Sequence, residues 1–161
     1  MENAHYFLHV TDTHLCFDAE TPDTCCTEKA LRSLYQTAFA WDHRPAFVLI
    51  TGDLVHEGTS ADYARAKILL QELDEQYHTK TYPALGNHDI RKNFNSAFRG
   101  LASDQPLDYC VQNEWLRWIV LDSSCGQVIG RLSGSQLAWL EQELNKPTDS
   151  PTILALHHPV Y

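Results

Sequence analysis

The sequence predicts an α/β fold, and three observations lead to this expectation. Short apolar runs of strand length alternate with longer segments whose apolar residues recur at helical spacing. Hydrophobic residues make up 43% of the 161 positions, which supplies the apolar surface that a folded core requires. The chain has no repeat or low-complexity tract, and its length is typical of one domain. We therefore expect a single domain in which crossover helices connect the strands.

The first half of the chain predicts three strands separated by two helices. Strands are expected at residues 6–10, 47–51 and 79–85, because each is a short apolar run that ends at polar or glycine-containing residues. One helix is expected from about 27 to 43, and a second begins near Thr59-Ser60, either of which could cap it. The residues expected on the buried faces are Leu31, Leu34, Tyr35, Ala38 and Phe39 in the first helix, and Tyr63, Ala66, Leu70, Leu73 and Tyr77 in the second.

The second half predicts a hairpin, a helix and a final strand. Residues 109–112 and 115–121 flank Asn113-Glu114, which suggests a hairpin turn. Ser133 to Gln136 has the form of a capping box and predicts the start of a helix. Residues 152–156 read as the last strand. The apolar stripe expected on the helix consists of Leu137, Leu140 and Leu144.

The charge of the chain bears on its partners. A formal net charge of −9 and the lack of a basic run argue against a nucleic-acid polymer as the partner, since such binding depends on clustered Lys and Arg. An acidic protein can still bind a small anionic substrate when bound cations dominate the local field. We therefore expect that any phosphate chemistry here depends on metal ions.

Cysteine usage and the N-terminal residues suggest a cytoplasmic setting. The five cysteines are odd in number, and Cys25 and Cys26 are adjacent, which is a poor basis for disulfides and favours reduced thiols. Residues 1–5 do not resemble a secretory signal, and no segment reaches transmembrane length. We expect a cytoplasmic protein without a membrane partner, and a homo-oligomer is possible.

Polar residues that suit metal binding follow four of the predicted strands. These residues are separated in the sequence, but the carboxyl ends of strands in an α/β sheet meet at one edge, where ligands bind. We therefore expect them to form one site. The residues are Asp12 and His14 after the first strand, Asp53 after the second, Asn87 and His88 after the third, and His157 after the last.

Carboxylate, imidazole and amide groups together suit two divalent or Fe-type metal ions such as Mn, Fe, Zn or Co. The absence of a cysteine cluster argues against a structural zinc site. One carboxylate can bridge two ions, and two ions can hold phosphoryl oxygens while lowering the pKa of a bound water. This donor set predicts hydrolysis of a phosphate ester by attack of hydroxide on phosphorus.

Four ordered motifs resemble those of the calcineurin-like metallophosphoesterases. They are Asp12-x-His14, Gly52-Asp53, Gly86-Asn87-His88-Asp89 and His157-His158-Pro159. Within that superfamily the chain is similar to the bacterial 3′,5′-cyclic-AMP phosphodiesterase and glycerophosphodiesterase branch, also called class III cyclic nucleotide phosphodiesterases. The segments that carry this closer similarity are residues 11–15, 51–54, 121–123, 130–133 and 136–140.

The resemblance implies a fold and a role for each residue of these motifs. The fold would be two facing sheets flanked by helices. Asp12 and His14 would bind the first metal, Asp53 would bridge, and Asn87 and His157 would bind the second. His88 would contact the phosphate or protonate the leaving group, and Asp89 would orient His88.

The chain also departs from the family pattern. The family carries a later Gly-His-x-His motif that supplies one more ligand to each metal, and this motif is absent from residues 1–161. We therefore expect the chain to be the N-terminal part of a single catalytic domain, with exposed sheet edges that promote self-association. His56 stands where purple acid phosphatases have a tyrosine ligand, and Asp89 stands where Ser/Thr phosphatases have Glu.

Several other polar residues are expected to have structural roles or none. His158 is expected to support the site and Asp122 to accept structural hydrogen bonds, while Cys16 is expected to be a bystander thiol. Arg91 and Lys92 are left open between steering of phosphate and simple solvation. The histidines not expected to be ligands are His5, His9, His43, His56 and His78.

The function predicted from the sequence is metal-dependent hydrolysis of a phosphoric diester, with a 3′,5′-cyclic nucleotide such as cyclic AMP as the leading substrate. One alternative is a phosphomonoesterase or nucleotidase on the same fold. Another is a non-catalytic metal-binding scaffold, because the set of ligands is incomplete.

Overall fold

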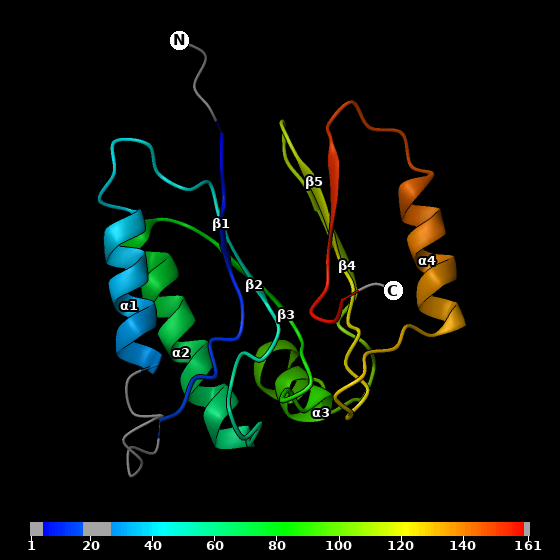
Figure 1. The fold of residues 1–161 in the computed structure, drawn as a ribbon, viewed down its shortest axis with the longest axis horizontal. Coiled ribbons are helices and arrows are strands. Elements are labelled where there is room, and N and C mark those ends of the chain that lie inside the picture. Colours follow the sequence, from blue (N-terminus) through cyan, green and yellow to red (C-terminus); the bar gives the residue numbers. More distant parts are fainter. Residues whose placement is uncertain (1–4, 18–26, 160–161) are drawn as a thin grey trace.

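The computed structural model describes residues 5–17 and 27–159 (Figure 1). The first sheet is parallel, in the order β1-β2-β3, and β2 is buried throughout. Helices α1 and α2 connect its strands, as the alternating pattern predicts. The elements are β1 (Leu8–Val10), α1 (Thr27–Ala38), β2 (Val48–Thr51), α2 (Ser60–Tyr77) and β3 (Thr81–Ala84).

The second sheet has the order β4-β5-β6. The predicted hairpin is confirmed, because β4 and β5 pair antiparallel, and β6 then pairs parallel to β5. The side chain of Asn113 closes the hairpin by accepting hydrogen bonds from the backbone N–H groups of Trp115 and Leu116. The elements are β4 (Tyr109–Gln112), β5 (Arg117–Val120), α4 (Gly134–Leu144) and β6 (Thr152–Ala155).

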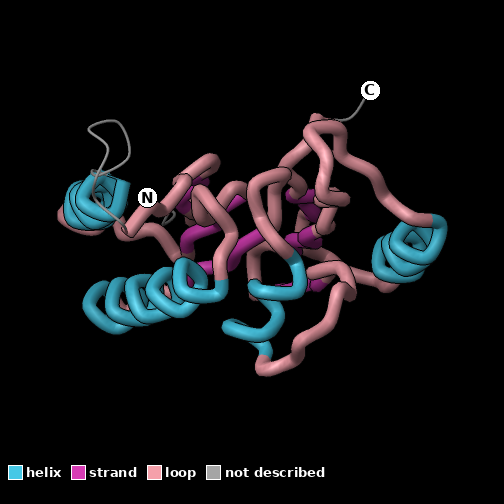
Figure 2. Tube along the Cα trace, turned by 90° about the horizontal axis from the view of Figure 1, so that it is seen from below, coloured by secondary structure: helices cyan, strands magenta, loops and turns pink. Residues whose placement is uncertain are grey.

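The two sheets lie between helices, with α1 and α2 on one side and α4 on the other (Figures 1 and 2). Alternate residues of β2 pack on opposite faces of its sheet: Val48 and Ile50 lie in the cluster that includes the helices, and Leu49 lies in the cluster between the sheets. Phe47 stacks on Trp118 of the second sheet with ring centroids 4.1 Å apart. The predicted architecture of two facing sheets flanked by helices is confirmed.

Capping residues fix the starts of two helices as predicted. Thr59 accepts a hydrogen bond from the backbone N–H of Asp62, whose carboxylate accepts one from the backbone N–H of Thr59. Ser133 and Gln136 form the same reciprocal pair at the start of α4. Both helices therefore begin where side chains satisfy their first N–H groups.

Other helix predictions were wrong. Helix α1 ends at Ala38 and not near residue 43. Leu34 is partly exposed, and the predicted apolar stripe of α4 is also wrong, because Leu137 and Leu144 are exposed while Gln136 and Glu143 are buried. Gln136 is buried because its amide donates to Asp108 and to the carbonyl of Asp122.

The stretch after β3 contains helical turns that the sequence pattern did not predict. These are α3 (Arg91–Phe94) and the π-helix η1 (Asn95–Arg99). Asn95 is fully buried, and its amide donates to the carbonyls of Ser103 and Gln105.

Among the described residues, none of the helices is both long enough and apolar enough to cross a lipid bilayer.

Candidate metal centre

The loops that follow β1 and β2 run side by side and carry three of the predicted ligands. The backbone N–H of Asp12 donates to the carbonyl of Gly52 over 3.2 Å, and that of His14 donates to the carbonyl of Asp53 over 2.8 Å. Asp12, His14 and Asp53 all adopt left-handed backbone conformations, with φ of 54°, 40° and 49°. Such conformations are uncommon outside glycine and cluster at functional sites, where the surrounding structure enforces them.

Asp53 lies between two imidazoles. Its carboxylate is only 3% exposed. Oδ2 lies 3.6 Å from Nε2 of His14, and Oδ1 lies 3.7 Å from Nε2 of His157. Oδ1 also accepts a hydrogen bond of 2.9 Å from the backbone N–H of His88. Each carboxylate oxygen therefore faces a different histidine, which is the arrangement that a bridging ligand requires.

His157 presents a lone pair toward two other acceptors. Its Nδ1 lies 3.0 Å from the carbonyl oxygen of Thr51, which can only accept, so the ring proton is on Nδ1. Nε2 then faces Oδ1 of Asn87 at 3.1 Å, in addition to Asp53. Lone pairs of His157, Asn87 and Asp53 therefore point toward one another, and such an arrangement suits a cation.

A second convergence of donors lies at Asp12, His14 and Asp53. One ligand atom from each lies within 4.8 Å of the other two. Oδ1 of Asp12 is 3.9 Å from Nε2 of His14, and Oδ2 accepts a hydrogen bond from the Thr11 hydroxyl. Carboxylate oxygens with an imidazole are a donor set for Mn²⁺, Fe or Zn²⁺, so the residues present fit the metal ions that the sequence predicts.

Two glycines allow these side chains to approach one another. A Cβ on Gly86 would lie 2.2 Å from Oδ1 of Asp53, and one on Gly52 would lie 2.3 Å from Nδ1 of His157. Gly52 also has φ of 85°, which favours glycine. Both motif glycines are therefore needed for close packing against the ligand side chains, and Gly52 is needed for the turn as well.

Burial shifts the pKa of three groups in and around this site. Desolvation lowers the pKa of His14, although the nearby carboxylate of Asp53 opposes this effect. Desolvation also raises the pKa of Asp89 to about 6, opposed by hydrogen bonds from the backbone N–H groups of Gly86 and Leu54. The pKa of Tyr63 is raised mainly by burial, so its hydroxyl remains a donor to Asp89.

The role predicted for Asp89, orientation of His88, does not match its contacts. Oδ2 of Asp89 accepts hydrogen bonds from the backbone N–H groups of Leu54 and Gly86, and Oδ1 accepts one from the Tyr63 hydroxyl. Nδ1 of His88 lies 3.0 Å from the carbonyl of His56 instead. Asp89 is buried among donors that need an acceptor, so it holds the loops after β2 and β3 together.

The structural roles expected for Asp122 and His158 are confirmed. Asp122 is fully buried and accepts hydrogen bonds from Arg91, from the backbone of Leu107 and from Ser124. Arg91 therefore pairs with a buried carboxylate and does not serve as a free phosphate-steering cation. His158 bonds Ser123 through Nδ1 at 2.8 Å, and its ring meets that of His157 edge to face with centroids 5.0 Å apart.

His56 was not expected to be a ligand, and its ring lies beside those of His14 and His88. The ring centroids of His56 and His14 are 5.5 Å apart, and those of His56 and His88 are also 5.5 Å apart. Its position three residues after Asp53, on the same loop, was the signal available in the sequence.

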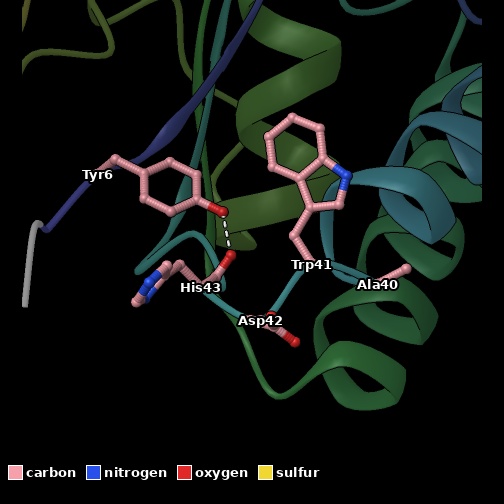
Figure 3. A pocket seen from close by; sticks show the side chains of 5 residues that line it. All are labelled: Tyr6, Ala40, Trp41, Asp42 and His43. Carbon is pink, nitrogen blue, oxygen red and sulfur yellow. Dashed lines mark hydrogen bonds between the residues drawn. The ribbon is translucent and has the colours of Figure 1, made fainter.

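A large hollow lies elsewhere. It has a volume of about 750 Å³ and is lined by Tyr6, Ala40, Trp41, Asp42 and His43 (Figure 3). These residues precede β1 and β2, whereas Asp12 and Asp53 follow those strands. The hollow is therefore at the opposite edge of the sheet from the candidate metal centre.

Comparison with known proteins agrees with this geometry. The model of the calcineurin-like phosphoesterases matches residues 5–161. The chain belongs to the calcineurin-like phosphoesterase family. Membership of this family implies divalent metal ions at the site. A dimetal phosphatase from Danio rerio, of known crystal structure, matches with a TM-score of 0.70 over 98% of this chain and 70% of that one, at 14% identity, which shows a shared fold.

Curated relatives confirm the predicted branch of the family. The chain is 38% identical over 157 residues to a probable cyclic nucleotide phosphodiesterase of Rhodococcus erythropolis, covering 96% of this chain and 52% of that protein. It is 36% identical over 155 residues to a cAMP/cGMP dual specificity phosphodiesterase of Mycobacterium tuberculosis, covering 94% and 49%. The chain thus spans about half the length of these relatives.

Proposed function

We propose that residues 1–161 are the metal-binding part of a single catalytic domain that hydrolyses phosphodiesters. Asp12 and His14 bind one divalent ion, Asn87 and His157 bind the other, and Asp53 lies between them. The observation that carries this proposal is that each oxygen of the buried Asp53 faces a different imidazole. Mn²⁺, Fe, Zn²⁺ and Co²⁺ are the ions that suit these donors.

Two ions at this position would neutralise charge on the phosphate and lower the pKa of a water molecule. The side chains of the protein position the metal ligands and contact the substrate. Asp53 and the backbone hydrogen bonds of its loop hold the ligands in place. His88 is exposed, and because Nδ1 donates to the carbonyl of His56, its Nε2 is the nitrogen directed to a substrate. In the protonated form this nitrogen donates to a phosphate or leaving-group oxygen.

The substrate we propose is a 3′,5′-cyclic nucleotide, with cyclic AMP as the first candidate. The names of the relatives from Rhodococcus erythropolis and Mycobacterium tuberculosis support this choice. The acidic chain also suits a small phosphate ester better than a nucleic-acid polymer, because it has no basic run. Cys110 and Cys125 are outside disulfides, which supports the cytoplasm as the setting.

The test measures hydrolysis of cyclic AMP, of bis(4-nitrophenyl) phosphate and of 4-nitrophenyl phosphate with Mn²⁺. We expect turnover of both diesters and a loss of at least about 100-fold in Asp53→Asn, since Asn tolerates the left-handed backbone but cannot bridge two cations as a carboxylate does. Asp42→Asn, at the opposite edge of the sheet, is the matched control.

Hydrolysis of the monoester alone would assign the chain to the phosphomonoesterases instead. Bound metal without turnover of any substrate would favour a metal-binding scaffold. Equal activity in Asp53→Asn and the parent chain would rule out the proposed centre.

A further inference from the structure

Three histidines, one from each strand end of the first sheet, form a cluster at the mouth of the metal centre. His14 follows β1, His56 follows β2 and His88 follows β3. One ring nitrogen from each lies within 4.8 Å of the other two. The rings of His14 and His88 meet edge to face with centroids 4.7 Å apart. The cluster contains no carboxylate, which distinguishes it from the set of Asp12, His14 and Asp53.

Two of these histidines have the partners that metal-binding histidines usually have. A ligating imidazole commonly donates its other N–H group to a backbone carbonyl or a carboxylate, which fixes the ring. Nδ1 of His88 bonds the carbonyl of His56 at 3.0 Å. Nε2 of His56 lies 3.5 Å from Oε1 of Glu57. Each ring therefore has one nitrogen engaged and the other available.

The distances allow a metal to bind with small adjustments. At Zn–N distances of about 2.0–2.1 Å, two ligand nitrogens of a tetrahedral site lie about 3.4 Å apart. The observed nitrogens lie within 4.8 Å of each other. Because His88 is exposed and His56 is partly exposed, rotation of these two side chains can close the difference without moving the backbone.

We propose that His14, His56 and His88 form a separate binding site for Ni²⁺, which excludes the ion bound by Asp12, His14 and Asp53. A set of three imidazoles suits Ni²⁺, whereas a set rich in carboxylate oxygens suits Mn²⁺. The two sites share His14, and a neutral imidazole nitrogen binds one ion at a time. The proposal rests on the proposed function only for the identification of His14 as a ligand of the Mn²⁺ site.

This second site inhibits the enzyme. A metal ion held by the three imidazoles removes His14 from the carboxylate set and occupies the nitrogen of His88 that is directed to the substrate. Excess Ni²⁺ therefore stops turnover supported by Mn²⁺, and the inhibition depends on His56. His56 is the member of the cluster that belongs to neither the carboxylate set nor the substrate contact.

The experiment is a calorimetric titration of the metal-free chain with Ni²⁺ and, separately, with Mn²⁺. We expect His56→Ala to weaken Ni²⁺ binding at least about tenfold, since even supporting contacts of a metal site contribute 10–100-fold, and to leave Mn²⁺ affinity unchanged. Asp12→Asn should do the reverse. His43→Ala, an exposed histidine at the opposite edge of the sheet, is the control for both ions.

Inhibition by Ni²⁺ of the Mn²⁺-loaded enzyme is the second readout, measured against each variant's own uninhibited rate. His56→Ala should raise the inhibitory concentration at least about tenfold. Ni²⁺ binding that is equal in His56→Ala and the parent chain, or absent from the parent chain, overturns the proposal. The calorimetric titration measures metal binding and needs no turnover. Its result therefore tests this site even if the proposed phosphodiesterase activity is absent.

Discussion

At the scale of single residues, the site depends on how closely side chains approach the backbone. Asp53 is in contact with the loop after β3 as well as with two imidazoles, because Oδ1 accepts from the backbone N–H of His88. Gly86 leaves the space that this approach needs. The carboxylate is therefore positioned by the absence of a side chain as much as by hydrogen bonds.

Gly86→Ala tests this dependence. The added Cβ would lie 2.2 Å from Oδ1 and 2.5 Å from the backbone N of Asp53, so the carboxylate must move. We expect Mn²⁺ affinity to fall about 10–100-fold, as for other displaced supports of a metal ligand. Gly134→Ala is the control, because a Cβ there meets nothing within 4 Å. Calorimetric titration measures both, and equal affinities in the two variants would contradict the expectation.

At the scale of elements, α2 is tied to the loop after β3 by one side chain. The Tyr63 hydroxyl donates to Asp89 over 2.9 Å and accepts from the backbone N–H of Ile90 over 2.8 Å. Asp89 in turn accepts from the loop after β2. One buried network thereby fixes a helix and two of the loops that carry ligands.

Tyr63→Phe removes the hydroxyl from this network. The Asp89 oxygen and the backbone N–H of Ile90 both lose a partner in a buried setting, so we expect a loss of about 1–3 kcal/mol in the free energy of unfolding. Urea denaturation measures it. Tyr77→Phe, at the C-terminal end of α2, keeps the ring that packs against Tyr35 and Phe39, so it should change stability by less than about 0.5 kcal/mol. A Tyr63→Phe variant as stable as that control would show that the network contributes little.

Helix starts and strands that carry a local sequence signal were predicted correctly. The capping residues Thr59 and Ser133 marked two helix starts, and apolar runs marked the strands, because both signals act within a few positions of the sequence. The role of Asp89 could not be predicted, since its partner Tyr63 lies 26 positions away on a helix. The helical turns at 91–99 are held by the buried amide of Asn95, and a periodic pattern of apolar residues does not predict such a contact.

The residues of the candidate site were predictable because strand ends share one edge of a sheet. The roles of these residues were only partly predictable from the sequence. His56 lies beside His14 and His88 because the loop after β2 pairs with the loop after β1, where the backbone N–H of His56 donates to the carbonyl of Leu15. The spacing of residues in the sequence does not specify this pairing.

At the scale of the whole molecule, two sheets face each other, and β6 is at one edge of the second. Leu154, in the middle of β6, is 47% exposed. An edge strand with an exposed apolar side chain offers its free backbone groups to another chain. We therefore predict that residues 1–161 self-associate through this edge.

Leu154→Lys should reduce that association, since a charged residue on an edge strand opposes pairing with a second copy. Sedimentation velocity over a range of concentrations measures the effect, and we expect the variant to remain monomeric at concentrations where the parent chain associates. Ile68→Lys is the control, because it also replaces an exposed apolar residue by lysine, but on α2. Equal association in both variants would place the contact elsewhere.

Among the five predicted ligands, His157 comes from the second sheet and the other four come from the first. An ion held by Asn87 and His157 would therefore cross-link the two layers, and binding to the native state alone stabilises that state. The lifetime of the folded chain would then follow the supply of the ion. Withdrawal of that ion would therefore loosen the contact between the layers and shorten this lifetime.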